Sequence, residues 1–332
     1  MSTARKALRA GAQVWQARPL TELIDSLLAQ YSPHAQWRWA DCVSEHLARS
    51  PWSNAAGQRP LVVQHQQSDL ALLQRLLREE GLVLRFERDT DTVVLLADTT
   101  REANCPALPD SPVRFHRDDA TEPGDTVQAL GSQRVLPTFT LTALASQHGA
   151  AASTAASTPS LADGWGPSSP RIEAYLHLGE VAWGQEGQGM TGAQADRALS
   201  LAQAGWEVQH KRFIGRSTVR SLHAGLRFEL QGSALDAELP LKGNDPAQRT
   251  LLASSVAHVG INNLPKGLSA QIAGLTGVKA SKDTNPHAEV LPPWVGPELR
   301  RQAAKSGYAN AFAAHRCWRR PKFDPPTAIV PM

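Results

Sequence analysis

Cysteine is scarce in this chain, and its scarcity already excludes two classes of protein. The 332 residues include three cysteines, Cys42, Cys105 and Cys317, which lie far apart along the sequence. An odd number of widely spaced cysteines does not form a disulfide framework, and none of the intervals matches the spacing of paired metal ligands. We therefore expect a protein that folds in the reducing environment of the cytoplasm.

An excess of charge of one sign is also missing. Lysine and arginine contribute 34 side chains and aspartate and glutamate 31, so the formal net charge is +3. This balance gives the chain as a whole no strong attraction to nucleic acid or to an anionic membrane. No apolar stretch approaches the roughly 18 residues of a membrane-spanning helix, and the N-terminus has no apolar signal-peptide segment. We expect neither a membrane nor nucleic acid as a partner.

Apolar residues, in contrast, are plentiful. They make up 42% of the chain, against 20% charged residues, which is enough to build a buried core and argues against wholesale disorder. The length corresponds to about two or three domains of typical size.

The clearest local pattern lies in residues 59–98. A strand is predicted at residues 61–65, and a helix follows because Ser68 or Asp69 can accept a hydrogen bond from a backbone N–H of its first turn. Gly81 stands where a helix ends in a left-handed residue. Residues 82–86 and 93–96 then alternate as the two strands of a hairpin.

The predicted helix has one apolar face and one charged face. Its leucines fall together at helical spacing, and Arg75, Arg78, Glu79 and Glu80 are predicted to lie mostly on the opposite face. A similar apolar spacing predicts a helix from Leu20 to Tyr31, between a strand that starts near Val14 and a strand over residues 37–39.

Further along the chain, strands outnumber helices. Residues 113–116 and 139–144 are predicted to be strands, residues 171–178 a strand and residues 193–204 a helix. Four more strands are predicted, at residues 206–214, 218–222, 226–230 and 251–259. Because short turns join them, the pattern indicates an antiparallel meander or barrel. Loops are predicted at residues 40–60 and 99–112.

Three groups of residues give the chain a resemblance to the VgrG family. VgrG is the spike protein of the type VI secretion system, and the baseplate hub protein of contractile phage tails is its relative. The first group is Gln64, Ser68, Asp69, Leu70, residues 76–82, Phe86, Glu87 and residues 95–98. The second is Gly215, Val219, Arg220, Leu222, Gly225, Phe228 and Leu230. The third is His258, Asn262, Asn263, Leu264, Tyr308, Asn310, Phe312, Trp318, Arg319 and Pro321. Residues 175–180 depart from the family pattern, and the resemblance covers about residues 14–330.

The resemblance implies a β-rich α+β fold of the phage tail hub type, with antiparallel barrel-like domains and a small α+β domain. The expected divisions are an α+β hub domain over residues 1–110, strands that return to an incomplete first barrel over 111–145, a flexible linker over 146–170, a second barrel-like domain over 171–275 and an irregular extension over 276–332. The linker is predicted because this segment is rich in Ala, Ser, Thr, Pro and Gly. Such a segment buries too little apolar surface to offset the loss of conformational entropy on ordering.

The resemblance also implies a function in assembly and no reaction. The expected protein is a homotrimeric structural hub that stacks on the Hcp tube, contacts secretion baseplate components and helps to deliver effectors. It would assemble in the cytoplasm and leave through the type VI apparatus. Because family members carry further segments before and after this region, we expect a chain truncated at both ends.

Two sequence features keep other functions open. Residues 187–192, from Gly187 to Gly192, fit the G-x-G-x-x-G pattern of a nucleotide-binding enzyme, although the preceding strand ends too early for the tight turn that this motif requires. Residues 316–322, from Arg316 to Lys322, form a basic cluster with one aromatic residue, which is compatible with a nucleic-acid-binding module.

The remaining polar residues do not indicate a catalytic or metal-binding site. We expect His258 to be a hydrogen-bonded structural histidine and residues 116–119, which include Asp118 and Asp119, to form a solvated turn. None of the histidines has the spacing of a zinc site. We therefore assign no catalytic, cofactor-binding or metal-binding residue.

Overall fold

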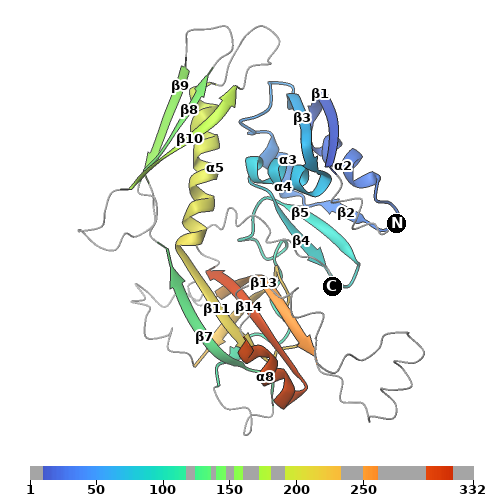
Figure 1. The fold of residues 1–332 in the computed structure, drawn as a ribbon, viewed down its shortest axis with the longest axis vertical. Coiled ribbons are helices and arrows are strands. Elements are labelled where there is room, and N and C mark those ends of the chain that lie inside the picture. Colours follow the sequence, from blue (N-terminus) through green and yellow to red (C-terminus); the bar gives the residue numbers. More distant parts are fainter. Residues whose placement is uncertain are drawn as a thin grey trace. The chain divides into compact units, whose positions relative to one another are not determined.

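The computed structural model describes residues 10–116, 124–135, 140–146, 153–159, 172–180, 191–232, 250–260 and 297–316. The chain forms two compact units, which Figure 1 shows as ribbons. The first unit contains Met1–Pro106, Arg134–Arg212 and His315–Met332, and the second contains Ala107–Gln133 and Phe213–Ala314.

The first unit begins with a long antiparallel ribbon. Strand β1 (Ala10–Pro19) pairs with β3 (Gln58–Ser68), and the described residues add no further strand to this sheet. A register shift falls between Gly11 and Ala12, opposite Gln66, whose φ of 49° lies in the left-handed region. An extra residue of this kind is a β-bulge, which bends and twists the ribbon.

Two amphipathic helices and a second sheet supply the core of this region. Helix α2 (Leu20–Ala29) and helix α4 (Asp69–Glu80) bury their leucines against the sheet β2 (Gln36–Trp39), β5 (Thr92–Leu96) and β4 (Val83–Glu87), with strand order β2-β5-β4. The short helix α3 (Cys42–Leu47) lies in the segment predicted as a loop.

The capping signals read from the sequence are confirmed. The Ser68 side chain accepts a hydrogen bond from the backbone N–H of Ala71 at 3.2 Å, and Gly81 ends α4 in the left-handed conformation with φ of 82°. The prediction for Glu80 is wrong: it is fully buried, because Arg59 from β3 supplies a partner that helical periodicity does not reveal.

The rest of the first unit is a small sheet covered by one long helix. Strands β10 (Glu173–Glu180), β8 (Thr140–Ser146) and β9 (Ser153–Pro159) form the sheet in that order, with β10 parallel and β9 antiparallel to β8. Helix α5 (Gly192–His210) packs its alanines and leucines on Leu141 and Ala143 of β8.

The second unit is a barrel-like sheet of six strands in the order β6-β12-β13-β14-β11-β7. Their bounds are β6 (Val113–Arg114), β7 (Val127–Arg134), β11 (Lys211–Ser217), β12 (Arg227–Gln231), β13 (Thr250–Gly260) and β14 (Tyr308–Arg316). Phe115, just after β6, bridges to Val127 of β7, so the two edges of the sheet meet. Helix α8 (Pro297–Ser306) packs beside β13.

The structure corrects several predicted elements. Part of the expected linker, residues 153–159, is strand β9, and part of the expected irregular extension is α8 followed by the buried strand β14. Residues 206–210 continue helix α5 where a strand was predicted, and residues 218–222 are a loop with a turn at Arg220 and Ser221. In these cases pairing with distant strands, or packing of a long helix, overrides the local signal.

Within the described ranges, no helix has both the length and the apolar character that a membrane crossing requires.

Candidate assembly surface

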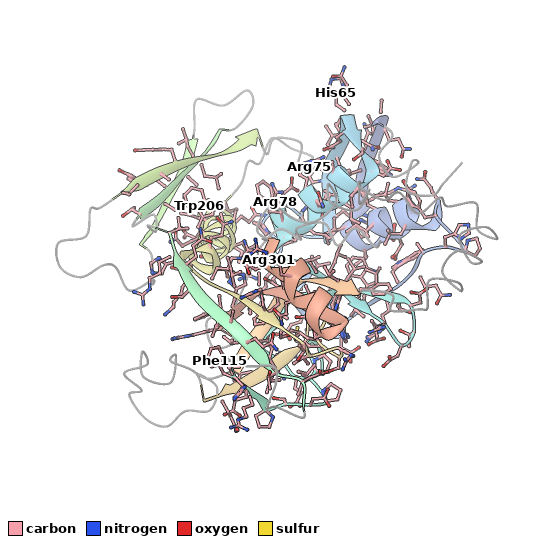
Figure 2. All side chains as sticks on the ribbon, turned by 60° about the horizontal axis from the view of Figure 1, so that its bottom comes forward. His65, Arg75, Arg78, Phe115, Trp206 and Arg301 are labelled. Atoms are coloured by element: carbon pink, nitrogen blue, oxygen red, sulfur yellow. The ribbon has the colours of Figure 1, made fainter. Side chains whose placement is uncertain are left out.

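One face of the β1–β3 ribbon is exposed although it carries apolar side chains. Val14 and Val63 are register partners, and their side chains are 61% and 43% exposed. Ala12, Gln16 and His65 belong to the same face and are exposed as well. Figure 2 shows His65 extending from the far end of the ribbon. An apolar strand face open to solvent is the kind of surface that proteins use for association.

The opposite face of the ribbon is anchored to the helices. Val62 and Gln64 of β3 are buried there. The Gln64 amide donates to an Asp69 carboxylate oxygen at 2.7 Å, and the Tyr31 hydroxyl donates to the other oxygen of that carboxylate at 2.5 Å. This chain of bonds ties β3 to the start of α4 and the end of α2, and it explains why Gln64 and Asp69 belong to the sequence pattern.

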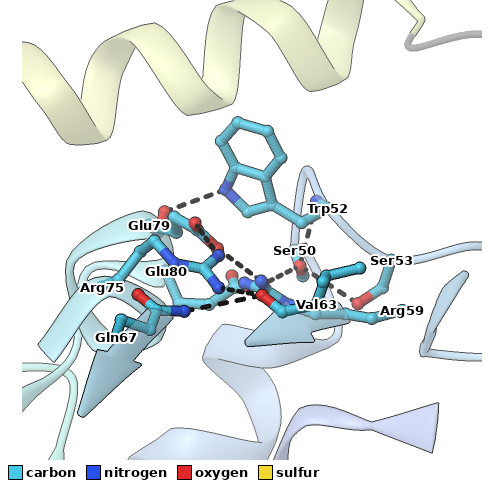
Figure 3. A network of polar contacts seen from close by, with 9 residues as sticks. All are labelled: Ser50, Trp52, Ser53, Arg59, Val63, Gln67, Arg75, Glu79 and Glu80. Atoms are coloured by element: carbon cyan, nitrogen blue, oxygen red, sulfur yellow. Dashed lines mark hydrogen bonds and ion pairs between the residues drawn. The ribbon is translucent and has the colours of Figure 1, made fainter. Parts of the chain in front are cut away.

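A buried ion-pair network fixes β3 to the end of α4 (Figure 3). Arg59 of β3 is 5% exposed and pairs with Glu80 at 2.7 Å and with Glu79 at 2.5 Å. Glu79 also pairs with Arg75 at 3.1 Å. The hydroxyl of Ser50 donates to the same Glu80 oxygen at 2.6 Å. Since buried charges are costly when unpaired, these bonds hold the ribbon in one position.

The network continues toward α5. The Trp52 indole donates to the Glu79 carbonyl at 3.0 Å, and its ring packs against the apolar cluster between α5 and β8. His46 Nε2 lies 2.6 Å from the Glu80 carbonyl, so this nitrogen carries the proton. Its Nδ1 can then accept from Arg197 of α5, whose Nη2 lies 3.4 Å away.

The surroundings of three titratable residues in this region shift their pKa values. Burial alone would lower the pKa of Arg59, but the coulombic attraction of Glu79 and Glu80 outweighs it and raises the pKa. Burial and the nearby Arg49 lower the pKa of Arg197. Burial and the bond to Asp69 raise the pKa of Tyr31, so its hydroxyl stays protonated.

Sequence reasoning missed the network residues from outside α4: His46, Ser50, Trp52, Arg59 and Arg197. His46, Ser50 and Trp52 lie in a predicted loop. Arg59 lies at the start of strand β3, and Arg197 lies on α5, which is distant in sequence. Their importance comes from contacts that span as many as 151 positions, and no local spacing signals such contacts.

In the second unit, several described residues of the family pattern lie together in the barrel, whereas residues 262–264 and 318–321 lie outside the described ranges. Phe312 of β14 packs edge-on to Phe228 of β12 with ring centres 5.6 Å apart, and Gly215 of β11 lies under the Phe312 ring. The Asn310 amide accepts from Ser217 at 2.6 Å and donates to the Val219 carbonyl at 2.7 Å. These contacts build a barrel core and its corner and do not resemble a catalytic arrangement.

His258, for which a hydrogen bond was predicted, makes one with Tyr308 of β14. Its Nδ1 lies 2.5 Å from the Tyr308 hydroxyl. The guanidinium of Arg220 lies over the Tyr308 ring, 5.5 Å from its centre, and pairs with Asp125 at 3.1 Å. The pattern residues His258, Tyr308 and Arg220 thus form one polar cluster on the barrel.

Among the described residues, the strands around α5 do not have the arrangement of a dinucleotide site. Thr191 caps α5 through a capping box with Gln194, and Gly192 is the first residue of the helix, while residues 187–190 lie outside the described ranges. The strands on either side of α5 belong to different sheets, since β10 pairs with β8 and β11 pairs with β14. A dinucleotide site requires both strands in one parallel sheet.

Two other segments considered as functional sites lie largely outside the described residues. Of residues 316–322, Arg316 ends β14 and the others lie outside the described ranges, as do residues 117–119 of the predicted solvated turn. Across the part of the chain that is described, no group of three His, Cys, Asp or Glu side chains could hold a metal ion.

Comparison with known proteins points to one family. The model of the family described as phage tail baseplate hub (GPD) matches residues 3–264. No curated protein matches the chain.

Several solved structures are similar in fold. The 43 kDa tail protein of prophage MuSo2 from Shewanella oneidensis has a TM-score of 0.51 at 8% identity, with 96% of this chain and 72% of that chain covered. A tail protein from Neisseria meningitidis MC58 has a TM-score of 0.52 at 10% identity, with 96% and 74% covered. An E. coli component of the type VI secretion system has a TM-score of 0.44 at 11% identity, and this chain spans 53% of its length.

Proposed function

The chain belongs to the phage tail baseplate hub (GPD) family, and we propose that it acts as a structural hub subunit of a type VI secretion spike. The observation that carries the proposal is the family match over residues 3–264, which includes parts of both compact units. The likeness to two tail proteins supports the hub fold. The narrower assignment to a type VI spike rests on the sequence motifs shared with VgrG.

In this proposal three copies of the chain form a ring that stacks on the Hcp tube. The described residues include three features through which copies of the chain could contact each other. These are a barrel-like sheet, a two-stranded ribbon and an exposed apolar strand face. An exposed apolar strand face is a surface on which another chain can pack. Baseplate components and effectors would be the further partners, and the assembled spike would leave the cytoplasm through the secretion apparatus.

Analytical ultracentrifugation of the full chain over a wide concentration range tests the proposal. We expect a species with three times the mass of the monomer, which co-sediments with preformed Hcp tubes. Bovine serum albumin in the same tubes serves as the control for trapping. A chain that remains monomeric at every concentration and stays in the supernatant would contradict the proposed function.

A further inference from the structure

His46 of α3 contacts two elements that lie far from it in the sequence. The residue is 9% exposed. Its Nε2 donates to the backbone carbonyl of Glu80, the last residue of α4, at 2.6 Å. Its Nδ1 lies 3.4 Å from Nη2 of Arg197 in α5. One imidazole ring therefore joins α3 to both α4 and α5, all within the first compact unit.

These two contacts require the neutral form of the ring. A backbone carbonyl only accepts hydrogen bonds, so Nε2 carries a proton, and a guanidinium only donates, so Nδ1 must offer its lone pair to Arg197. Neutral imidazole with its proton on Nε2 satisfies both partners. Protonated imidazole has two N–H donors, so it keeps the bond to Glu80 but loses the bond from Arg197.

The charges around the ring act in opposite directions on its two sides. On the α4 side, the Glu80 carbonyl belongs to a helix C-terminus, whose partial negative charge favours a cation. On the α5 side, protonation would place a positive charge beside Arg197, which already has Arg49 as a like-charged neighbour. Arg49 pairs with Glu45 at 3.7 Å, but both side chains are exposed and such a pair is weak. A charged His46 therefore stays with α4 and repels Arg197.

The acidic side chains at the end of α4 do not remove this repulsion. Glu80 attracts Arg197, but its carboxylate oxygen Oε1 already accepts from Arg59 at 2.7 Å and from Ser50 at 2.6 Å. Glu79 pairs with the same Arg59. Both carboxylates are thus held in place by the buried network, so it is Arg197 that moves when the ring is charged.

Arg197 can move because its side chain is only partly buried, which gives the guanidinium access to water. Two other contacts hold α5 to the same region. The Gln194 amide donates to the Ser53 carbonyl at 3.2 Å, and the Trp52 ring packs on the apolar cluster of α5 and β8. Figure 3 shows this ring pointing toward the helix. Release of Arg197 would therefore loosen α5 over Trp52 and expose its ring.

We propose that His46 is a pH-sensitive latch: its neutral ring holds Arg197 of α5 at the end of α4, and its protonated ring releases Arg197. The latch lies within one subunit, so the inference goes beyond the proposed function and does not depend on association. The Arg197 contact is complete while the imidazole is neutral and is lost as the pH falls through the range in which the ring titrates. For an unperturbed histidine this range is centred at about pH 6.5.

Hydroxyl-radical footprinting of the full chain at about pH 7.5 and about pH 5.5, on either side of the titration of histidine, tests the latch. We expect the oxidation rate of Trp52 to rise at least about twofold at the lower pH, because local opening exposes its ring. Trp206 of α5, which is 39% exposed, serves as the internal reference and should change little. An unchanged Trp52 rate, or an equal rise at every tryptophan as in global unfolding, would overturn the proposal.

Three variants assign the pH response to this pair of residues. His46→Gln retains an N–H donor for the Glu80 carbonyl but does not titrate, and Arg197→Met removes the guanidinium that protonation repels. In both variants the Trp52 rate should be the same at the two pH values. His65→Gln is the matched control, because His65 is an exposed histidine of β3, and it should keep the wild-type response.

A further variant keeps the test decisive. If Arg197→Met does not fold by circular dichroism, Arg197→Gln replaces it, since its amide can rotate to accept from a charged ring. A wild-type response that persists in a folded His46→Gln would show that another group titrates and would overturn the latch. A response that persists in the Arg197 variant, or that disappears in His65→Gln, would overturn it as well.

Discussion

At the scale of single residues, Gly215 shows how an absent side chain shapes the barrel. A Cβ atom at this position would lie 2.3 Å from Cζ of Phe312, whose ring is fully buried and packed against Phe228. The sequence pattern marked both Gly215 and Phe312, but their contact across β11 and β14 exists only in the folded sheet.

The variant Gly215→Ala should therefore lose stability. Because the ring of Phe312 has no free space to move into, we expect a loss of about 1–3 kcal/mol, the typical cost of overpacking. Denaturant unfolding measures it. Gly131→Ala is the matched control in the same sheet, because the nearest atom to its Cβ is 4.0 Å away. Equal stability of the two variants would contradict this account.

Arg59 anchors the ribbon through its buried ion pairs with Glu79 and Glu80. The variant Arg59→Met leaves Glu80 charged and buried, and we expect a loss of about 3–5 kcal/mol in unfolding free energy. Arg301→Met is the control, since its pair with Glu298 is exposed at 74% and 55% and should contribute less than about 1 kcal/mol. The double variant Arg59→Met/Glu80→Leu should recover part of the loss, because it removes the stranded charge.

At the scale of elements, the sequence predicted the helices and strands whose boundaries depend on neighbouring residues. Helix α4 begins at Ser68 and ends at Gly81 because a cap and a left-handed residue act within a few positions. Strand β14 escaped prediction because its sequence, YANAFAAHR, is rich in alanine, which has little preference for strands. Its neighbours β11 and β13 make it a strand.

The β4–β5 hairpin carries a pH-dependent contribution to stability. Hydrogen bonds from Arg85 and Thr90 and, more weakly, from Arg38 lower the pKa of Glu87 from 4.5 to about 2. Because the folded state favours the carboxylate, this contribution is complete above pH 4.5 and is lost as the pH falls through about 2. Glu87 is partly exposed, so we expect only about 1 kcal/mol.

The comparison of wild type with Glu87→Gln measures this contribution. The difference in unfolding free energy between them should be largest near neutral pH and should shrink steadily as the pH approaches 2. A difference that stays constant over this range would show that the carboxylate charge is not the cause.

At the scale of the whole molecule, the exposed valine pair should matter for association and not for folding. The variant Val14→Lys places a charge on the exposed apolar face of the ribbon, where Val14 is 61% exposed, and lysine on a strand opposes association. We expect the association constant to fall by about tenfold or more, with an unchanged melting temperature. Val135→Lys is the control, since Val135 is similarly exposed, at 50%, but lies outside the ribbon.

The sequence by itself determined the hub family of this protein, the ends of α4 and the strand that contains Trp37 and Trp39. These features depend on neighbouring residues or on the order of motifs, which a sequence displays directly. Only the tertiary structure decided the burial of Glu80 and the identity of β9 and β14 as strands. Each of these depends on a partner outside the element, such as Arg59 for Glu80 and β11 for β14. Such pairings form only when folding brings distant segments together.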